Sequence, residues 1–287
     1  MTPTAELRLI DSLQRALGDQ QLHMVYQPKI SLRDGGLRQV EALVRWEDPE
    51  LGTVKPSHFV PLAEQHGLID ELTNWGLRRI LRQWLDWNEE GLDTCIAFNI
   101  SALSLQHLDF PDLVERMCRA LEVPTDRLVL ELTEGATQPL VKLMDALTRF
   151  RIKGIGLAID DFGTGYSSMS LMKQFPIDTI KIDRSFVRDL PKDTEDQAIA
   201  QAIISMGKAL GMTVVAEGVE NYEQHSFLRD HACDEMQGYL FSKPLPPEQL
   251  AEMLRSAPLM NSPPLQPATS DPSEQSALLS RLRSASV

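Results

Sequence analysis

The chain has 287 residues, 43% of them hydrophobic, which suits one large α/β domain or two small ones. Its formal net charge of −13 excludes long-range attraction to polymeric nucleic acid, because no basic surplus exists to displace the counterions of a phosphate backbone. No apolar run approaches the roughly 20 residues that a membrane helix needs, and the three cysteines lack metal-like spacing, so we expect a cytoplasmic protein, or the cytoplasmic portion of a larger one, without membrane insertion.

The N-terminal part of the chain predicts a lead-in segment followed by a hairpin. Residues 1–20 form the lead-in, and strand-like segments follow at 23–30 and 37–46. The gap between these two strands reads SLRDGG, and Asp-Gly-Gly in so short a connection is typical of a hairpin turn. A hairpin pairs its strands antiparallel. A long amphipathic helix is then expected at about 70–87.

Strand–helix units repeat along the rest of the folded part. The expected strands are 95–101, 127–134, 154–161, 178–186, 212–219 and 233–241, and the expected helices are 112–121, 139–150, 167–174, 194–209, 221–230 and 247–255. Strands that are separated by helices of this length pair in parallel. The pattern predicts an α/β fold over residues 21–256, a modified TIM (β/α)8 barrel with one antiparallel strand from the hairpin; an open doubly wound sheet is the alternative. Residues 257–287, rich in Pro and Ser, are expected to be a disordered tail.

A polar side chain stands at or near the C-terminal end of almost every expected strand: Glu41, Asn99, Glu131, Asp160 with Asp161, Lys181 with Asp183, Glu217 and Gln237. In a parallel barrel these strand ends open on one face, the face that hosts catalysis. Because side chains alternate along a strand, Lys181 points to the barrel axis if its apolar neighbours Ile180 and Ile182 face the helices. The same alternation directs Glu131 inward. We therefore expect these polar groups to meet in one site.

The residue types at the strand ends indicate a site for hard cations. Carboxylates and an amide, without clustered His or Cys, prefer Mg²⁺ or Mn²⁺ to Zn²⁺ or copper. Asp160 and Asp161 can stay ionised side by side if cations lie between them and neighbouring oxygens. One bridging Asp with a ligand set on each side predicts two ions roughly 3.5–4 Å apart, an arrangement that activates water and clamps a phosphoryl group.

Eight short motifs occur in order over about residues 10–255: YQPK (26–29), EALVR (41–45), NIS (99–101), ELTE (131–134), DDFGTGYSS (160–168), KID (181–183), AEGVE (216–220) and QGYLF (237–241). In these motifs the chain resembles the EAL-domain family of bacterial cyclic di-GMP phosphodiesterases. The resemblance implies the modified barrel with one antiparallel strand. It also implies hydrolysis of one phosphodiester bond of cyclic di-GMP to linear pGpG, with two Mg²⁺ or Mn²⁺ ions per site.

The resemblance further implies a role for each matched residue. The ligands of the first ion would be Glu41, Asn99, Glu131 and Asp160, and those of the second Asp160, Asp161 and Glu217, with Asp160 bridging. The catalytic residues would be Lys181, Glu217 and Glu41; Lys181 would hold the attacking water as a neutral base or as an ammonium. The substrate contacts would be Gln27, Leu43, Arg45, Asp183 and Gln237. The anchors of the loop after Asp161 would be Glu134 and Gly163.

Two other functions remain open at this point. The barrel could be a non-catalytic cyclic di-GMP receptor, or a Schiff-base aldolase with Lys181 as nucleophile, although nearby carboxylates favour a protonated lysine. As partners we expect the dinucleotide and a second copy of the chain, bound through the region after the DDFGTG loop. Ca²⁺ is expected to inhibit, because it takes longer, looser coordination and is a weaker Lewis acid than Mg²⁺.

Overall fold

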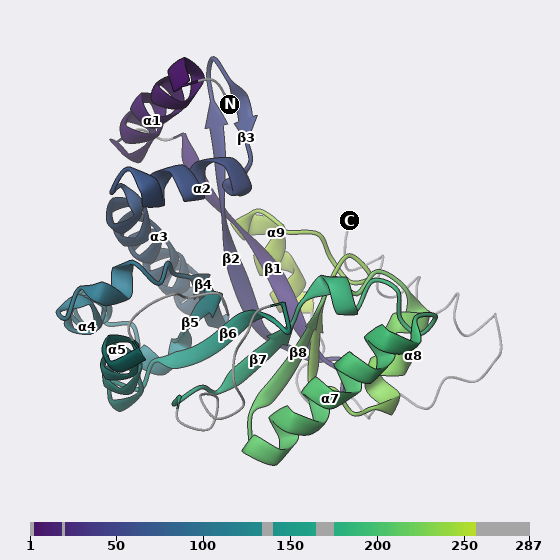
Figure 1. Cartoon of the computed structure of the whole chain (residues 1–287). Coiled ribbons are helices and arrows are strands. Elements are labelled where there is room, and N and C mark those ends of the chain that lie inside the picture. Colours follow the sequence, from purple (N-terminus) through teal and green to yellow (C-terminus); the bar gives the residue numbers. More distant parts are fainter. Residues whose placement is uncertain (1–2, 19–20, 134–139, 165–174, 257–287) are drawn as a thin grey trace.

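A computed structural model describes residues 3–18, 21–133, 140–164 and 175–256 (Figure 1). Within these ranges, the elements before the repeated units are α1 (Pro3–Gly18), β1 (Leu22–Ser31), β2 (Leu37–Asp48), β3 (Gly52–Val54), α2 (Pro56–Gln65) and α3 (Ile69–Glu89). The repeated units are β4 (Cys95–Asn99), α4 (Phe110–Ala120), β5 (Leu128–Thr133), α5 (Leu140–Ile152), β6 (Gly156–Phe162), β7 (Thr179–Ile182), α7 (Thr194–Leu210), β8 (Thr213–Glu217), α8 (Tyr222–Asp230), β9 (Glu235–Gln237) and α9 (Pro247–Ser256). Four expectations fall outside the described residues: the helix at 167–174, the homodimer region, Glu134 and the tail at 257–287.

The sheet closes into a barrel of eight strands. Its order is β1-β9-β8-β7-β6-β5-β4-β2, and pairing between β1 and β2 closes the ring. Only β1, among these described strands, runs antiparallel to its neighbours β2 and β9, while β2 pairs in parallel with β4. The predicted barrel with one reversed strand is therefore confirmed, and the open sheet is excluded. β3 adds a strand on the outer edge of β2 that the sequence pattern did not predict.

The hairpin that reverses β1 follows from local chemistry. Gly35 has φ of +71°, a left-handed conformation that favours glycine, and its N–H donates to the carbonyl of Ser31 at 2.9 Å. The carboxylate of Asp34 accepts from the N–H of Gly36 at 2.9 Å. These contacts make a tight turn, so β2 returns beside β1 with Gln27 opposite Glu41 and Lys29 opposite Gln39.

Several strands are shorter than the sequence pattern predicted, and β7 and β9 end earliest, four residues before the expected position. β7 ends at Ile182 because the next residue, Asp183, accepts a hydrogen bond from the N–H of Ser185 at 3.0 Å and begins a 3-10 turn. β9 ends at Gln237 because Gly238 lies against the backbone of Val219: a Cβ built on Gly238 would be 2.1 Å from the carbonyl oxygen of Val219. In both strands, the chain leaves the sheet at the barrel mouth.

The helices cover the outside of the barrel (Figure 1). The main apolar core lies between these helices and the strands. A second apolar cluster lies where α1 and α2 pack beside β2 and β3; its buried side chains include Leu13 of α1, Phe59 of α2 and Trp46 of β2. In the described part of the chain, no helix is both long enough and apolar enough to cross a bilayer.

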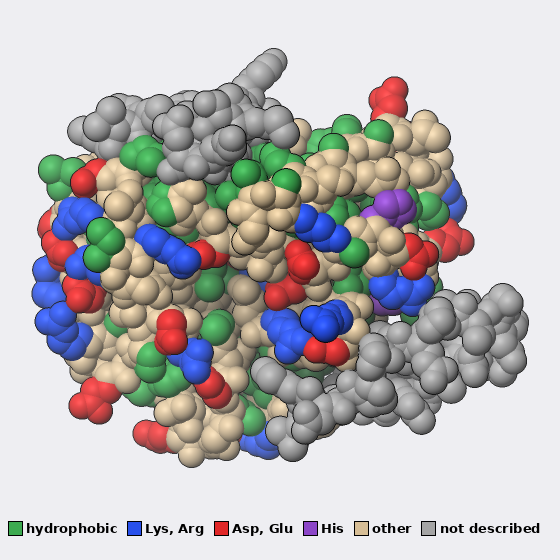
Figure 2. Space-filling view, turned by 90° about the horizontal axis from the view of Figure 1, so that it is seen from below, with side chains coloured by type: hydrophobic (Ala, Val, Ile, Leu, Met, Phe, Trp, Pro, Cys, Tyr) green, Lys and Arg blue, Asp and Glu red, His purple; other side chains and the backbone are tan. Residues whose placement is uncertain are grey.

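Charged side chains of both signs are mixed on the face drawn in Figure 2, where Lys and Arg do not merge into one broad basic area. That face offers a polyanion no continuous basic surface. The expectation that the chain does not bind polymeric nucleic acid stays a prediction.

Candidate functional site

Lys181 of β7 lies at the centre of the barrel, fully buried. Its Nζ atom is 2.6 Å from a carboxylate oxygen of Glu217, 2.7 Å from Glu131, 3.1 Å from Asp160 and 3.5 Å from Glu41. Its neighbours Ile180 and Ile182 pack in the apolar core instead. Side-chain alternation along β7 therefore directs Lys181 inward, and four strands each contribute one carboxylate to it.

The carboxylates around Lys181 form two overlapping groups. Oxygens of Glu41, Glu131 and Asp160 all lie within 4.8 Å of one another, and so do oxygens of Asp160, Asp161 and Glu217. We call these five residues the acidic cluster. Asp160 belongs to both groups, and the side-chain N–H of Asn99 donates to Glu41 at 2.6 Å. Either group of oxygens is close enough together to bind one divalent ion.

A second buried lysine lies below the acidic cluster. Lys29 of β1 has no exposed surface, and its Nζ is 2.5 Å from Oε1 of Glu131 and 3.0 Å from the side-chain oxygen of Gln39. Sequence reasoning missed its role, although Lys29 is part of the YQPK motif. The signal was available: with Gln27 facing inward, alternation along the strand also turns Lys29 inward.

The buried charges shift one another's pKa values. Burial lowers the pKa of Lys181, but Glu131, Glu217 and the other carboxylates outweigh it and raise that pKa well above its usual value. Burial alone would raise the pKa of Glu131, but Lys181 and Lys29 outweigh it and lower that pKa to about 2. For Glu217, burial prevails over the attraction of Lys181 and raises the pKa to about 8. Burial, Asp160 and Asp183 raise the pKa of Asp161 to about 6.

These shifts test whether the site suits divalent cations. The acidic cluster holds five carboxylates and contacts two lysines, Lys29 and Lys181. Burial first, and neighbouring carboxylates after it, raise the pKa values of Glu41, Asp161 and Glu217, so positive charge placed between them would favour their ionised forms. The donors are all oxygens, the ligand type that Mg²⁺ and Mn²⁺ prefer. The residues present therefore fit two small, hard cations.

The loop after β6 is bent sharply at the edge of the cluster. Asp161 has φ of +53°, unusual for a residue other than glycine, and its N–H donates to the carboxylate of Asp160 at 2.9 Å. Gly163 has φ of +101°, and a Cβ there would be 2.8 Å from the ring of Phe186. This conformation turns the Asp161 side chain back toward the cluster and permits only glycine at position 163 without strain.

Two amide side chains border the cluster on the side of β1 and β9. The side-chain N–H₂ of Gln237 donates to Glu41 at 2.7 Å and to the side-chain oxygen of Gln27 at 3.0 Å. Gln27 in turn donates to the backbone carbonyl of Ser242 at 3.1 Å. The side-chain oxygen of Gln237 is buried and has no hydrogen-bond partner in the described residues.

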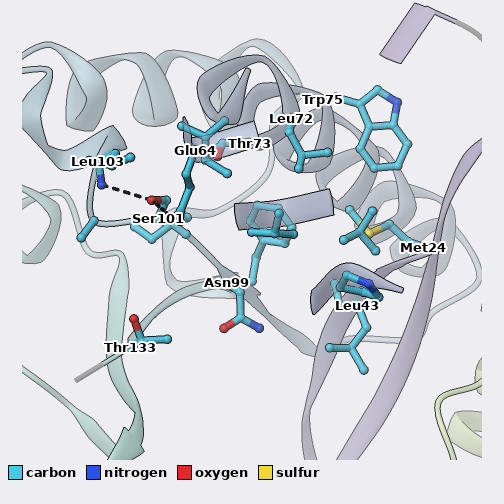
Figure 3. A pocket seen from close by; sticks show the side chains of 18 of the residues that line it. Met24, Leu43, Glu64, Leu72, Thr73, Trp75, Asn99, Ser101, Leu103 and Thr133 are labelled. Carbon is cyan, nitrogen blue, oxygen red and sulfur yellow. Dashed lines mark hydrogen bonds between the residues drawn. The ribbon is translucent and has the colours of Figure 1, made fainter. Parts of the chain in front are cut away.

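A cavity of about 510 Å³ adjoins the acidic cluster, and we call it the side cavity (Figure 3). In Figure 3 Asn99 lies between Thr133 and Leu43 at the end of the cavity nearest the cluster. Arg45 also lines it. Its further walls carry the apolar side chains of Met24, Leu72, Trp75 and Phe98. They also carry two polar residues, Ser101 and Glu64, and the hydroxyl of Ser101 donates to the carboxylate of Glu64 at 2.6 Å.

The structure thus brings together almost every site residue that the sequence pointed to. The acidic cluster, Asn99 and Lys181 meet at the barrel mouth, Gln27 and Gln237 border them, and Leu43 and Arg45 line the side cavity. Asp183 lies beside Asp161, and Glu134 is outside the described residues. The sequence pattern assigned no role to Glu64 of α2 and Trp75 of α3, which lie away from the strand ends. It assigned none to Ser101 either, although that residue belongs to the NIS motif (99–101).

Comparison with known proteins gives related sequences and structures. The model of the EAL domain family matches residues 10–244. The cyclic di-GMP phosphodiesterase NbdA of Pseudomonas aeruginosa is 42% identical over 91% of this chain and 34% of its own length. The bifunctional diguanylate cyclase/cyclic di-GMP phosphodiesterase MucR of the same organism is 40% identical over 85% of this chain and 36% of its own length. This chain therefore spans about a third of the length of these two relatives.

A solved structure of the PaMucR phosphodiesterase in a c-di-GMP complex has a similar fold. Its TM-score to this chain is 0.81, with 40% sequence identity, and the match covers 85% of this chain and 99% of that one. The similarity to MucR is thus found in both sequence and structure.

Proposed function

The chain belongs to the EAL domain family, and from this premise we propose that it hydrolyses cyclic di-GMP to linear pGpG. The observation that carries the proposal is the pair of carboxylate groups that share Asp160 around the buried Lys181. The 40–42% identity to curated phosphodiesterases supports the substrate. The net reaction adds water across one phosphodiester bond: the water oxygen joins phosphorus, the P–O3′ bond breaks, and one proton goes to the leaving 3′ oxygen.

We assign the acidic cluster to two divalent ions, Mg²⁺ or Mn²⁺. Glu41, Glu131, Asp160 and Asn99 would hold the first, and Asp160, Asp161 and Glu217 the second. When bound, such a pair of ions lowers the pKa of water and stabilises the charge that develops on the phosphoryl group. The excess of carboxylates over lysines in the cluster supports this assignment, because it is the charge pattern that two cations would balance.

The chain's own residues then orient the reactants. Lys181 is held as an ammonium by the carboxylates around it, and we propose that it positions the attacking water by donating a hydrogen bond. Arg45 would pair with a substrate phosphate, and Gln237, which borders the acidic cluster through Glu41, would contact the substrate or its ordered water. A guanine base would enter the side cavity, whose apolar walls and polar Glu64 suit a flat ring with N–H donors.

A product assay tests the proposal. The chain is incubated with cyclic di-GMP and Mg²⁺, with and without EDTA. The nucleotides are then separated by chromatography and identified by mass spectrometry. We expect linear pGpG with Mg²⁺ or Mn²⁺, none in EDTA, and inhibition when Ca²⁺ replaces Mg²⁺. Undiminished turnover in EDTA, or full activity with Ca²⁺ alone, would contradict the role given to the ions.

The two alternative functions make different predictions in the same assay. A receptor would bind cyclic di-GMP and return it unchanged. An aldolase needs a neutral amine at position 181, and the raised pKa of Lys181 opposes that. Borohydride trapping of a carbonyl compound on Lys181 would support the aldolase and contradict the phosphodiesterase.

Two further expectations stay predictions. The homodimer surface falls on residues outside the described ones, and light scattering of the purified chain would measure the oligomeric state. A cytoplasmic location would be checked by fractionation of the producing cells.

A further inference from the structure

Lys29 lies on the side of the acidic cluster away from the barrel mouth. β1 runs antiparallel to β2 with Gln27 opposite Glu41 and Lys29 opposite Gln39, so Lys29 lies two residues further from the barrel mouth than the position opposite Glu41. Lys29 has no exposed surface, and no site function has been assigned to it above. Its Nζ atom bonds Oε1 of Glu131 at 2.5 Å and the side-chain oxygen of Gln39, its partner in the β1–β2 pairing, at 3.0 Å. These two contacts tie Lys29 to the barrel interior below the cluster.

Glu131 is held by both lysines at once, through different oxygens. Oε1 contacts Lys29, and Oε2 lies 2.7 Å from Lys181. Glu131 is itself fully buried, so it cannot turn away from either lysine without leaving that lysine unpaired in the dry interior. Because Lys181 also contacts Asp160 and Glu41, Oε2 is the oxygen on the side of the other ligands.

From this geometry we propose that Lys29 is a positioning residue that limits Glu131 to one ligating oxygen and so makes the site select small divalent ions over Ca²⁺. The proposal rests on the function proposed above, in which Glu131 is an ion ligand. A carboxylate oxygen has room for more than one partner, so Oε2 can contact both Lys181 and an ion. Oε1 is held toward Lys29, on the far side of Glu131, and therefore points away from the other ligands.

The chemistry of the ions explains the selection. Ca²⁺ takes six to eight oxygens at 2.3–2.6 Å and often binds a carboxylate through both oxygens, whereas Mg²⁺ takes six at about 2.0–2.1 Å. A site whose deepest carboxylate offers one fixed oxygen cannot supply the extra donor that Ca²⁺ uses. Gln39 matters only as the second anchor of Lys29, and it does not contact Glu131 in any described hydrogen bond.

Calorimetric ion titration without substrate tests the proposal. Mg²⁺, Mn²⁺ and Ca²⁺ are titrated into the unchanged chain and into Lys29→Met, which keeps the side-chain length but removes the N–H donors. We expect the ratio of Ca²⁺ affinity to Mg²⁺ affinity to rise about tenfold in Lys29→Met, the lower end of the effects seen when an outer partner of a metal ligand is lost. Removing the charge of Lys29 changes the affinity for both divalent ions alike. The ratio of the two affinities therefore reports only on how many oxygens Glu131 offers to the ion.

Three further variants complete the experiment. Lys29→Arg keeps a donor to Oε1 and should restore the original ratio, and Gln39→Leu, which leaves the Lys29–Glu131 pair in place, should not change it. Circular dichroism checks folding, and Lys29→Leu, which also lacks a donor, replaces Lys29→Met if the latter does not fold. If the folded neutral variant at position 29 has a ratio of Ca²⁺ affinity to Mg²⁺ affinity within twofold of that of the unchanged chain, the role given to Lys29 is overturned. The ion assignment of the proposed function is not affected by that result. Failure of the unchanged chain to bind any of the three ions overturns both this role and the ion assignment of the proposed function.

Discussion

Asp160 is the residue on which the two carboxylate groups depend. It is the only member common to both, and it also accepts a hydrogen bond from the N–H of Asp161 and forms an ion pair with Lys181. Its position follows from β6, which delivers Asp160 to the barrel mouth while Ile159 and Phe162 stay in the apolar core. A change at Asp160 therefore affects both proposed ions while leaving the packing of the strand intact.

Asp160→Asn should remove turnover with little effect on folding. The amide has the same shape, but it is neutral and offers one oxygen where the carboxylate offers two, so it bridges two ions poorly. Loss of an ion costs several kcal/mol of transition-state stabilisation, so we expect the rate of pGpG formation to fall at least about a hundredfold. Asp145→Asn, on the exposed surface of α5, is the matched control and should keep full activity. Chromatography of the product measures both; wild-type activity in Asp160→Asn would refute the shared ligand.

Gly238, the residue after Gln237, lies so close to the backbone of Val219 that no other amino acid fits at this position. A Cβ on Gly238 would be 2.1–2.6 Å from backbone atoms of Val219, which cannot move away as a flexible side chain could. We expect Gly238→Ala to lower the free energy of unfolding by about 3 kcal/mol, the upper part of the range for overpacking, and to raise KM by displacing Gln237. Gly18→Ala, where a Cβ meets nothing within 4 Å, is the control. Urea unfolding that gives equal midpoints for the two variants would show that the close approach is not maintained.

The site residues differ in how well the sequence predicts them. Lys181 and Glu131 are flanked by apolar residues in regular strands, so alternation alone places them inside the barrel. Lys29 obeys the same alternation, but it lies near the C-terminal end of the antiparallel strand β1, which is on the side of the barrel away from the mouth. Only the paired strands reveal that it reaches Glu131. Trp75 and Glu64 belong to helices, where the sequence gives no register relative to the barrel mouth. Contacts between distant elements therefore required the structure.

At the scale of elements, strand order was predictable and strand length was not. The turn residues and the helix spacing determine which strands are parallel, because these are local geometric constraints. The ends of β7 and β9 depend instead on a side-chain hydrogen bond at Asp183 and on the close packing of Gly238 against Val219. β3 has three residues and pairs only with β2, too short a segment for a periodic pattern to appear.

α8 contains a buried histidine that should make stability depend on pH. His225 is 4% exposed, and its Nδ1 atom has no hydrogen-bond partner in the described residues. Burial lowers the pKa of His225 from 6.5 to about 4, and Arg229 acts in the same direction while Asp230 opposes it. Between these two pH values the unfolded chain binds more protons than the folded one, so the contribution of His225 to stability is lost as pH falls from 7 toward 4.

We therefore expect the loss of unfolding free energy between pH 7 and pH 5 to be smaller in His225→Phe than in the unchanged chain, by about 2 kcal/mol. Phenylalanine keeps a ring for contact with Tyr222, whose centroid lies 6.1 Å from that of His225. His58→Phe, at an exposed position of α2, is the control and should follow the unchanged chain. Urea unfolding in EDTA at both pH values gives the comparison. Equal pH dependence in His225→Phe and the unchanged chain would mean that His225 takes up its proton without unfolding.

At the scale of the whole molecule, two apolar clusters serve different parts of the site. The main core packs the helices on the barrel and fixes the strands that carry the acidic cluster. The second cluster joins α1 to α2, β3 and the start of α3. The side cavity is lined by residues of α2 and α3, among them Val60, Glu64 and Leu72. The acidic cluster is thus held by the barrel, whereas the walls of the side cavity depend on the packing of α1.

Leu13→Ala should separate these two parts of the site. Leu13 of α1 is 1% exposed in the second cluster, and truncation of a buried leucine to alanine costs about 2–5 kcal/mol. Because α2 loses support while β6 and β7 do not, we expect KM for cyclic di-GMP to rise several-fold and kcat to change less than about twofold. Leu7→Ala, on the same helix but 60% exposed, should leave stability within about 0.5 kcal/mol of the unchanged chain and alter neither constant. Steady-state kinetics and urea unfolding measure both variants. A fall in kcat at constant KM in Leu13→Ala would show instead that the N-terminal cluster supports the acidic cluster itself.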